Sequence, residues 1–147
     1  MDINDLEWSK RYADKFFDGI WSNHTLEDIR DPIGVLREAK RIAKRGMFGT
    51  PHWTCELTVM DNRDDWEHIC GWPHHKWLVG INKSTGAYEF FPKLSWVVAD
   101  NAYEKSQQNL NIEWDGEDFV FQDIHMAYPG TSKRVDLVRW LDDRWQK

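Results

Sequence analysis

The sequence predicts an α/β fold, in which a strand, a helix and a second strand are followed by β-hairpins and further helices. Two short apolar runs, residues 17–23 and 46–53, have the length and composition of buried strands. The segment between them, residues 31–45, repeats apolar residues at helical spacing. Because the connections are short, this order is typical of a right-handed parallel crossover within one sheet.

The helix in this unit has recognisable start and stop signals. Asp31 is a suitable N-cap, and Pro32 favours the first helical position. Basic residues crowd the last turn, where the helix dipole favours cations, and we expect Gly46 to stop the helix. Ligands of α/β sheets bind beyond the carboxyl ends of the strands. The residues expected there are Ser22, Asn23, His24, Thr50, Pro51, His52 and Trp53.

Three further segments are predicted to be helical or irregular. Residues 2–17 mix charged and aromatic side chains without a clear period, so we expect a loop with a short helical turn. Residues 61–69 and 96–109 favour short helices.

The second half of the chain predicts hairpins and a last helix. Residues 76–81 and 87–92 form one hairpin pattern around a polar turn. Residues 112–128 form another, with Asp115-Gly116 as the turn signal. A terminal helix is expected over residues 132–146, capped by Ser132.

Composition limits the class of protein. A length of 147 residues favours one domain, here divided into a first unit over residues 1–81 and an aromatic-rich α+β extension over residues 82–147. The net charge of −6 argues against nucleic-acid and anionic-membrane partners. Since no long apolar run or leader pattern is present, we expect a soluble, cytoplasmic protein. Cys55 and Cys70 are expected to be thiols, with a lone disulfide as the alternative.

The segment from Phe17 to His52 resembles class I S-adenosylmethionine-dependent methyltransferases of the type 11 group, over their fourth strand, the following helix and the fifth strand. It is similar to the group's pattern FD-x-V-x-S-x-H-x-LEH-x-x-DP, with Asp28 in place of the second histidine. Residues 74–81 also resemble a segment that some of these proteins carry after the fifth strand. The matching residues are Phe17, Asp18, Ser22, His24, Leu26, Glu27, Asp31 and Pro32.

The resemblance implies a truncated, Rossmann-like methyltransferase sheet within residues 1–81. In the family, a glycine-rich loop and a ribose-binding acid precede the fourth strand, and nothing before Phe17 matches either of them. The resemblance makes S-adenosylmethionine the expected cofactor, while the missing elements argue against its binding, and against catalysis, by this chain alone. The residues that the resemblance places beside the cofactor are Asp2, Ile3, Asn23 and His24.

Three histidines are candidates for catalysis. His24 ends the first predicted strand, and His74 and His75 lie in the second matching segment, which the resemblance places on the substrate side of the sheet. An imidazole there could take a proton from a hydroxyl or amine substrate. The alternative is that these imidazoles are hydrogen-bonded or solvated without a role. For Glu27 we favour a structural role over a site role.

A metal site is the second chemical possibility. The segment HICGWPHH gathers imidazole and thiol groups, which zinc accepts as ligands, and an H-x-x-C pair lies upstream. Because neither spacing matches a standard zinc motif, we expect no metal and keep a small His/Cys metal-binding protein as an alternative. The residues concerned are His52, Cys55, His68, Cys70, His74 and His75.

The predicted function follows from what the resemblance leaves out. The first strand would pair in the family with a strand that this chain lacks, which leaves an open edge beside residues 19–23. We expect a homodimer or a partner protein to cover that edge. The chain is therefore predicted to be a methyltransferase-like binding or assembly module. The alternative is an active methyltransferase completed by a separate chain or by dimerisation.

Overall fold

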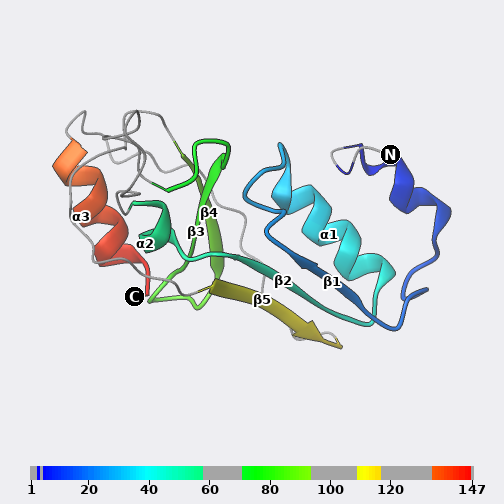
Figure 1. Ribbon diagram of the computed structural model, residues 1–147. Helices are drawn as coiled ribbons and strands as arrows, with labels where there is room; N and C mark the ends of the chain where they lie inside the picture. The colour runs from blue at the N-terminus through cyan, green and yellow to red at the C-terminus, as the bar shows by residue number, and fades with distance from the viewer. Residues whose placement is uncertain (1–2, 4, 58–70, 94–108, 117–133, 147) are drawn as a thin grey trace.

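The structure, a computed structural model, describes residues 3, 5–57, 71–93, 109–116 and 134–146. Figure 1 shows how their elements are arranged. In chain order these are the 3₁₀ helix η1 (Leu6–Arg11), β1 (Ile20–Asn23), α1 (Pro32–Ile42), β2 (Arg45–Pro51), α2 (Trp53–Glu56), β3 (Trp77–Ile81), β4 (Tyr88–Pro92), β5 (Asn109–Asp115) and α3 (Arg134–Arg144).

The predicted strand–helix–strand unit is confirmed. β1 and β2 are parallel neighbours, with Ile20 opposite Gly46 at one end of the ladder. The Asp31 carboxylate accepts a hydrogen bond of 2.8 Å from the Gly34 N–H, so it caps α1 as expected. α1 lies along one face of the sheet (Figure 1) and buries the residues that recur at helical spacing, which are Val35, Leu36, Ala39 and Ile42.

The end of α1 differs from the prediction, because Gly46 does not stop the helix. The helix ends at Ile42, and Ala43 already has extended backbone with φ −118° and ψ 142°. Gly46 lies inside β2, where an added Cβ would come within 2.3 Å of the Trp114 ring. The glycine is needed for the close approach of that ring from β5, a contact that the local sequence does not reveal.

The N-terminal segment packs onto α1 through one arginine. η1 is the short helical turn expected within residues 2–17. The Arg41 guanidinium donates to the carbonyl oxygens of Ser9 and Tyr12 at 2.9 and 3.0 Å, and to the Asp14 carboxylate at 2.7 Å. Arg41 therefore holds the segment before β1 against α1. The sequence alone predicts a different role for it, as a cation that the helix dipole favours in the last turn.

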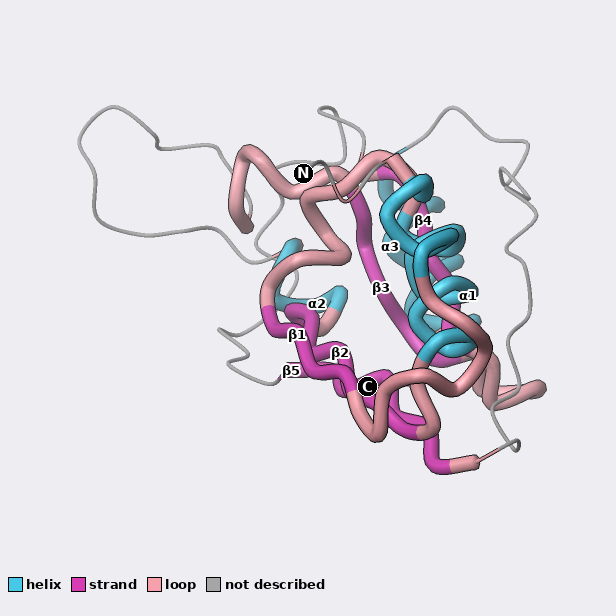
Figure 2. Tube along the Cα trace, turned by 90° about the vertical axis from the view of Figure 1, so that its right-hand side faces the viewer, coloured by secondary structure: helices cyan, strands magenta, loops and turns pink. Residues whose placement is uncertain are grey.

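β5 completes a three-stranded sheet in the order β1-β2-β5, and it runs antiparallel to β2. The sequence predicts this strand as the first arm of a hairpin over residues 112–128, whereas it begins at Asn109 and pairs with β2. Residues 117–128 lie outside the described part of the chain. Leu110, Ile112 and Trp114 alternate toward the core, as the two-residue period of a strand requires. Figure 2 shows the three strands side by side and β3 running apart from them.

The hairpin of β3 and β4 forms as predicted. The Asn82 side chain accepts hydrogen bonds from the Ser84 and Thr85 N–H groups, and Gly86 turns the chain with φ 71°. The hairpin is buried on both faces. Its Val79 and Phe90 belong to the first core with α1, β2 and β5, while the second core contains Leu78, Phe91, Trp53, Leu57, Leu141 and Trp145.

α2 and α3 enclose the second core. The second predicted strand was expected to reach Trp53, but β2 ends at Pro51, and His52 caps the single turn of α2. The Trp53 indole is fully buried and donates to the Gln146 carbonyl at 2.9 Å. α3 confirms the terminal helix from Arg134 onward, while its expected cap Ser132 and the helices expected over residues 61–69 and 96–109 lie outside the described residues.

A buried carboxylate joins this terminal helix to the hairpin. Glu89 of β4 accepts hydrogen bonds from Asn82 at 2.9 Å, from two nitrogens of Arg144 at 2.5 Å and from the Trp145 indole at 2.7 Å. We call these four residues the Glu89 junction. Within the described part of the chain, no helix is both long and apolar enough to cross a membrane.

The outer edge of β1 is the edge that the sequence analysis singled out. β1 is the end strand of its sheet, so no described strand pairs with its outer side. The Trp21 side chain is 60% exposed, and its ring lies over Gly19, where an added Cβ would fall 2.1 Å from it. A homodimer or a partner protein at this edge stays a prediction.

Candidate functional site

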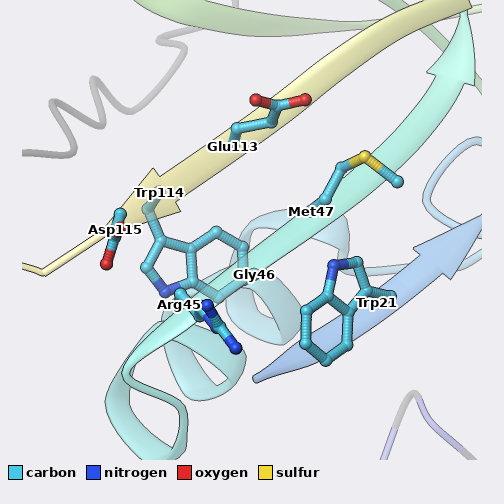
Figure 3. A pocket seen from close by; sticks show the side chains of 7 residues that line it. All are labelled: Trp21, Arg45, Gly46, Met47, Glu113, Trp114 and Asp115. Atoms are coloured by element: carbon cyan, nitrogen blue, oxygen red, sulfur yellow. The ribbon is translucent and has the colours of Figure 1, made fainter. Parts of the chain in front are cut away.

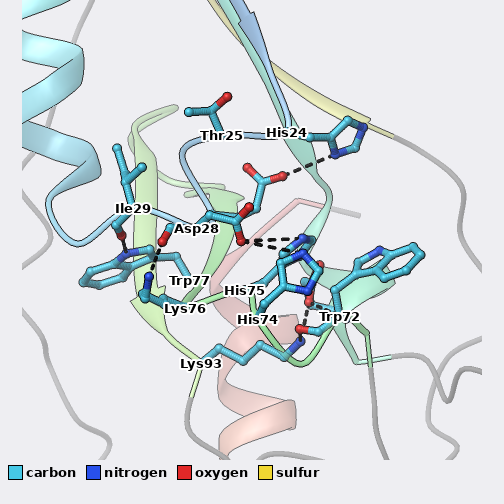
Figure 4. Close-up of polar contacts among 12 residues, drawn as sticks. His24, Thr25, Asp28, Ile29, Trp72, His74, His75, Lys76, Trp77 and Lys93 are labelled. Atoms are coloured by element: carbon cyan, nitrogen blue, oxygen red, sulfur yellow. Dashed lines mark hydrogen bonds and ion pairs between the residues drawn. The ribbon is translucent and has the colours of Figure 1, made fainter. Parts of the chain in front are cut away.

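The three predicted catalytic histidines lie together at the carboxyl end of β1 (Figure 4). His24 directly follows β1, and His74 and His75 come from the loop that precedes β3. Asp28, from the same loop as His24, has its Oδ1 3.9 Å from Nε2 of both His74 and His75. We call the cluster of His24, Glu27, Asp28, His74 and His75 the histidine face.

Backbone contacts bring these two distant segments together. The Lys76 N–H donates to the Glu27 carbonyl at 2.6 Å, and the Trp77 indole donates to the Ile29 carbonyl at 2.8 Å. The Lys76 ammonium donates to the Asp28 carbonyl. Each contact joins the loop after β1 to the start of β3, so the folding of the hairpin against this loop positions the histidines.

His24 and Glu27 form the upper part of the site. His24 has a left-handed backbone with φ 52°, its N–H donates to the Gly49 carbonyl at 2.9 Å, and its side chain is 51% exposed. Its Nδ1 lies 3.3 Å from Glu27 Oε1. Glu27 is fully buried, and neither carboxylate oxygen has a hydrogen-bond partner among the described residues. Burial raises the pKa of the Glu27 carboxyl, although the backbone N–H of Glu27 itself and the charges of the nearby histidines oppose that change.

The structural role that we favoured for Glu27 stays a prediction, and its surroundings differ from those of a typical structural carboxylate. A structural carboxylate would accept hydrogen bonds from a helix start or from neighbouring donors. Glu27 accepts none from the described residues, so its burial costs free energy. Buried titratable groups with a shifted pKa and a charged neighbour are concentrated at functional sites.

His75 is held by a buried carboxylate. Its Nδ1 lies 2.6 Å from Oε1 of Glu56, and both side chains are almost completely buried. Burial works to raise the pKa of Glu56, but the hydrogen bond from His75 and the charge of Lys93 outweigh it and hold that pKa below its usual range. An ionised Glu56 can only accept, so Nδ1 of His75 carries the proton of this hydrogen bond, and in the neutral tautomer the lone pair is on Nε2.

The segment around Trp72 borders the site next to His74 and His75. Gly71 has φ 56°, and an added Cβ would lie 2.4 Å from Glu56 Oε2, so the glycine lets the chain pass this carboxylate. The Trp72 carbonyl accepts hydrogen bonds from Lys93 and from the His75 N–H, at 2.9 and 3.1 Å. The half-exposed Trp72 ring lies near both histidine rings and provides an apolar wall (Figure 4).

The other residues predicted beside the cofactor lie elsewhere. The Asn23 side chain lies over Gly49 on the exposed face of the sheet, where a Cβ on that glycine would meet Asn23 Oδ1 at 2.1 Å. Ile3 packs against the first core, and Asp2 lies outside the described residues. Only His24 of this set belongs to the histidine face, and the cofactor-binding role of all four stays a prediction.

The other candidate metal ligands in the described part of the chain, His52 and Cys55, are not brought together with His74 and His75. His52 is buried, and its Nδ1 lies 2.7 Å from the Thr54 hydroxyl and accepts from the Thr54 N–H, so it caps α2. Burial lowers the pKa of this histidine. Cys55 lies half-buried on α2, while His68 and Cys70 lie outside the described residues. The prediction of two thiols therefore stays a prediction.

Sequence reasoning missed three residues of the site, Glu56, Asp28 and Lys93. Asp28 did carry a signal, because it stands where the family pattern has a histidine, yet it was treated only as a departure from that pattern. Glu56 and Lys93 carried none, since their meeting with His75 depends on contacts between residues far apart in the chain.

A hollow of about 380 Å³ lies on the exposed face of the sheet, at the start of β2 and the end of β5 (Figure 3). Trp21 and Trp114 line it, with Arg45 placed 5.9 Å above the Trp21 ring. It contains no histidine, so the residues predicted for acid–base chemistry lie outside it.

Comparison with known proteins finds a similarity in the first part of the chain. The model of a family described as "Methyltransferase domain" matches residues 2–48, which span η1, β1, α1 and the first residues of β2. No curated protein and no solved structure matches the chain. The matched segment contains the pattern on which the resemblance rested, and it includes His24, Glu27 and Asp28 of the histidine face. Residues 2–48 of this chain are thus similar to a methyltransferase domain, which is consistent with the class I S-adenosylmethionine-dependent group.

Proposed function

We propose that this chain provides the methyl-acceptor side of a methyltransferase-like protein, as a binding module that does not hold the cofactor by itself. One observation carries this proposal. The segment similar to methyltransferases carries His24 and Asp28, and Asp28 lies 3.9 Å from His74 and His75 near the carboxyl end of β1. α/β sheets bind their ligands at this end of the strands, which supports an acceptor beside these histidines.

The cofactor does not fit the described residues alone. S-adenosylmethionine supplies the methyl group in this family, and its methionine and ribose parts need a close glycine backbone and an acidic strand end. β1 and β2 end at Asn23 and Pro51, and neither strand is followed by a glycine-rich loop. The nearest acids, Glu27 and Asp28, belong to the histidine face. We therefore assign cofactor binding to residues outside the described part of this chain.

The histidine face suits an acceptor that must lose a proton. The hydrogen bond between Nδ1 of His75 and Glu56 leaves Nε2 as the ring nitrogen that faces the site, where its lone pair can accept a proton. His24 is a second imidazole at the edge of the site, half exposed and next to Glu27. Hydroxyl and amine acceptors match these groups, with the Trp72 ring as an apolar contact.

The open edge of β1 is the proposed docking place for the cofactor-holding part. β1 is an edge strand with an exposed Trp21, and unpaired strand edges accept another strand. In the family the strand that precedes the glycine-rich loop pairs at this edge. A partner there, or a second copy of this chain, would place the cofactor beside the histidine face.

Calorimetric titration tests whether this chain provides the acceptor side while another chain binds the cofactor. The 147-residue chain alone is expected to show no saturable binding of S-adenosylmethionine. A complex with a chain that carries the glycine-rich loop is expected to bind it, and to methylate compounds from a panel of small alcohols and amines. In that complex, H24A and H75Q together should lower methyl transfer by about 10²–10⁴-fold. Cofactor binding should stay within about twofold, as the acceptor side does not touch the cofactor.

Two results would overturn the proposal. Tight binding of S-adenosylmethionine by the isolated chain would show that its own residues form the cofactor-binding site. An unchanged rate of transfer in the double variant would remove the histidine face from the acceptor side. Light scattering on the chain alone shows whether a second copy occupies the edge of β1.

A further inference from the structure

Three potential ligand atoms converge on one point of the histidine face. Oδ1 of Asp28 lies 3.9 Å from Nε2 of His74 and 3.9 Å from Nε2 of His75. These three atoms all lie within 4.8 Å of one another. Figure 4 shows the two imidazoles and the Asp28 carboxylate pointing toward one another from separate segments of the chain.

The spacing is close to that of a bound divalent ion. Ligand atoms held about 2.05 Å from a tetrahedral zinc ion are separated by about 3.3 Å. The observed separations from Asp28 exceed this by roughly half an ångström, which small side-chain rotations can close. His74 has the freedom to rotate, because its side chain is 63% exposed.

The environment of His75 is that of a metal ligand. A ligating histidine usually donates its other ring N–H to a carboxylate, which fixes the tautomer and makes the ligand nitrogen more basic. Glu56 accepts from His75 in this way, at 2.6 Å from Nδ1, and the Lys93 ammonium pairs with Glu56 from its other side. The lone pair of His75 therefore points from Nε2 toward Asp28, where an ion would lie.

Unsatisfied oxygens beside these nitrogens provide a second, independent indication. Asp28 Oδ1 is buried without a hydrogen-bond partner among the described residues, although the rest of its side chain is partly exposed. The Glu27 side chain is 1% exposed, and both of its carboxylate oxygens are buried without a hydrogen-bond partner among the other described residues. Its carboxyl interacts electrostatically with both His75 and Asp28. Buried carboxylate oxygens without donors are costly, and a cation offsets that cost.

We propose that Asp28, His74 and His75 bind a divalent transition-metal ion, with zinc as the best-matched class. Two imidazoles and a carboxylate suit zinc and its neighbours rather than magnesium or calcium, which prefer oxygen ligands alone. Three protein ligands leave a coordination position for water or a substrate, as in catalytic zinc sites.

This inference does not depend on methyl transfer. The ion would use the lone pair of His75, so His24 would be the imidazole that remains to accept a proton from an acceptor. Metal binding is measured on the chain alone without S-adenosylmethionine, so failure of the metal site and failure of the proposed function give separate results.

The test is titration of the chelator-treated, full 147-residue chain with zinc chloride, followed by cobalt(II). We expect one zinc ion per chain with a dissociation constant below roughly 10 μM. Cobalt(II) in the same site should show the visible absorption of a low-coordinate complex with nitrogen and oxygen ligands, and zinc should displace it.

Variants assign the ion to its ligands. H74A removes an exposed ligand without disturbing the core, and it should weaken zinc binding by more than about tenfold. D28N should do the same, and E56Q should weaken binding about 10–100-fold through its effect on His75. H24A is the matched control, an exposed histidine of the same face outside the ligand set, and should leave the affinity unchanged.

Two outcomes would overturn the proposal. Zinc binding too weak to saturate at roughly 100 μM would exclude the site. Full-affinity binding that persists in both H74A and D28N would show that other residues hold the ion. Far-ultraviolet circular dichroism of each variant checks that the fold is retained, and E56Q is interpreted only if its spectrum matches that of the parent protein.

Discussion

The histidine face and the Glu89 junction each contain a buried carboxylate, and they differ in the hydrogen-bond donors that surround it. Glu89 accepts hydrogen bonds from Asn82, Arg144 and Trp145. Burial works to raise its pKa, but these donors outweigh it and hold the pKa below the usual range. Glu27 is equally buried and has no such donor among the described residues, so burial raises its pKa.

We interpret the difference as a structural use of the carboxylate at Glu89 and a functional use at Glu27. A buried carboxylate with a full set of donors fixes the elements that supply them, here the β3–β4 hairpin and the end of α3. A buried carboxylate without donors lowers stability, and such a cost is typical of sites that bind or react. Opposite effects of substitution at the two positions would support this interpretation.

The largest expected effect is at the Glu89 junction. E89A leaves the buried donors of Asn82, Arg144 and Trp145 without an acceptor, so the free energy of unfolding should fall by about 3–5 kcal/mol. Urea denaturation measures this change, and E113A on the exposed face of β5 serves as a control expected within about 0.5 kcal/mol of the parent. A loss below about 1 kcal/mol would mean that the junction is not a stabilising network.

Glu27 should show the opposite sign. E27M replaces a buried carboxylate that lacks donors by an apolar side chain of similar length, so the metal-free protein should gain about 1–3 kcal/mol. The same urea denaturation measures it. A destabilised E27M would show that Glu27 has a structural partner after all and would remove the contrast between the two regions.

Acid should weaken the contribution of Glu89. Its pKa is lower in the folded protein than in the unfolded chain, so its stabilisation is present above the ordinary glutamate pKa and is lost as the pH falls through the folded pKa. The stability difference between the parent and E89A should therefore shrink on acidification, by at most about 1.4 kcal/mol per pH unit. Urea denaturation between pH 7 and pH 3 tests this, and a constant difference would contradict it.

The smallest expected effect is at the contact that positions the histidine face. W77F removes the indole N–H that donates to the Ile29 carbonyl at 2.8 Å, which should cost about 1 kcal/mol. It should also weaken zinc binding by a few fold, because the loop that carries Asp28 is held less firmly against His75. W21F, on the exposed side of β1, is the control expected to change neither quantity.

Local signals predicted the parts of the fold that depend on neighbouring residues. The Asp31 cap, the helical spacing within α1, the parallel pairing of β1 with β2 and the β3–β4 hairpin are all encoded over short stretches of chain. The end of α1 was mispredicted because Gly46 serves a contact with Trp114, a residue 68 positions further on.

The candidate site was predictable only in part, for the same reason. The resemblance drew attention to His24, His74 and His75, and the structure brings them together with Asp28. Glu56 could not be foreseen, since its contact with His75 depends on how α2 packs beside the loop at Gly71. The absence of donors around Glu27 is likewise a property of the packed structure and leaves no trace in the sequence.

The hydrogen bond from Trp53 to Gln146 has a consequence for the order of folding. It joins residues 93 positions apart, and the second core around it gathers side chains from α2, the hairpin and α3. Contacts that close such long loops are slow to form, whereas β1, α1 and β2 are adjacent in sequence and lose less chain entropy on pairing. The methyltransferase-like unit should thus form early, and the second core should consolidate only after α3 has docked.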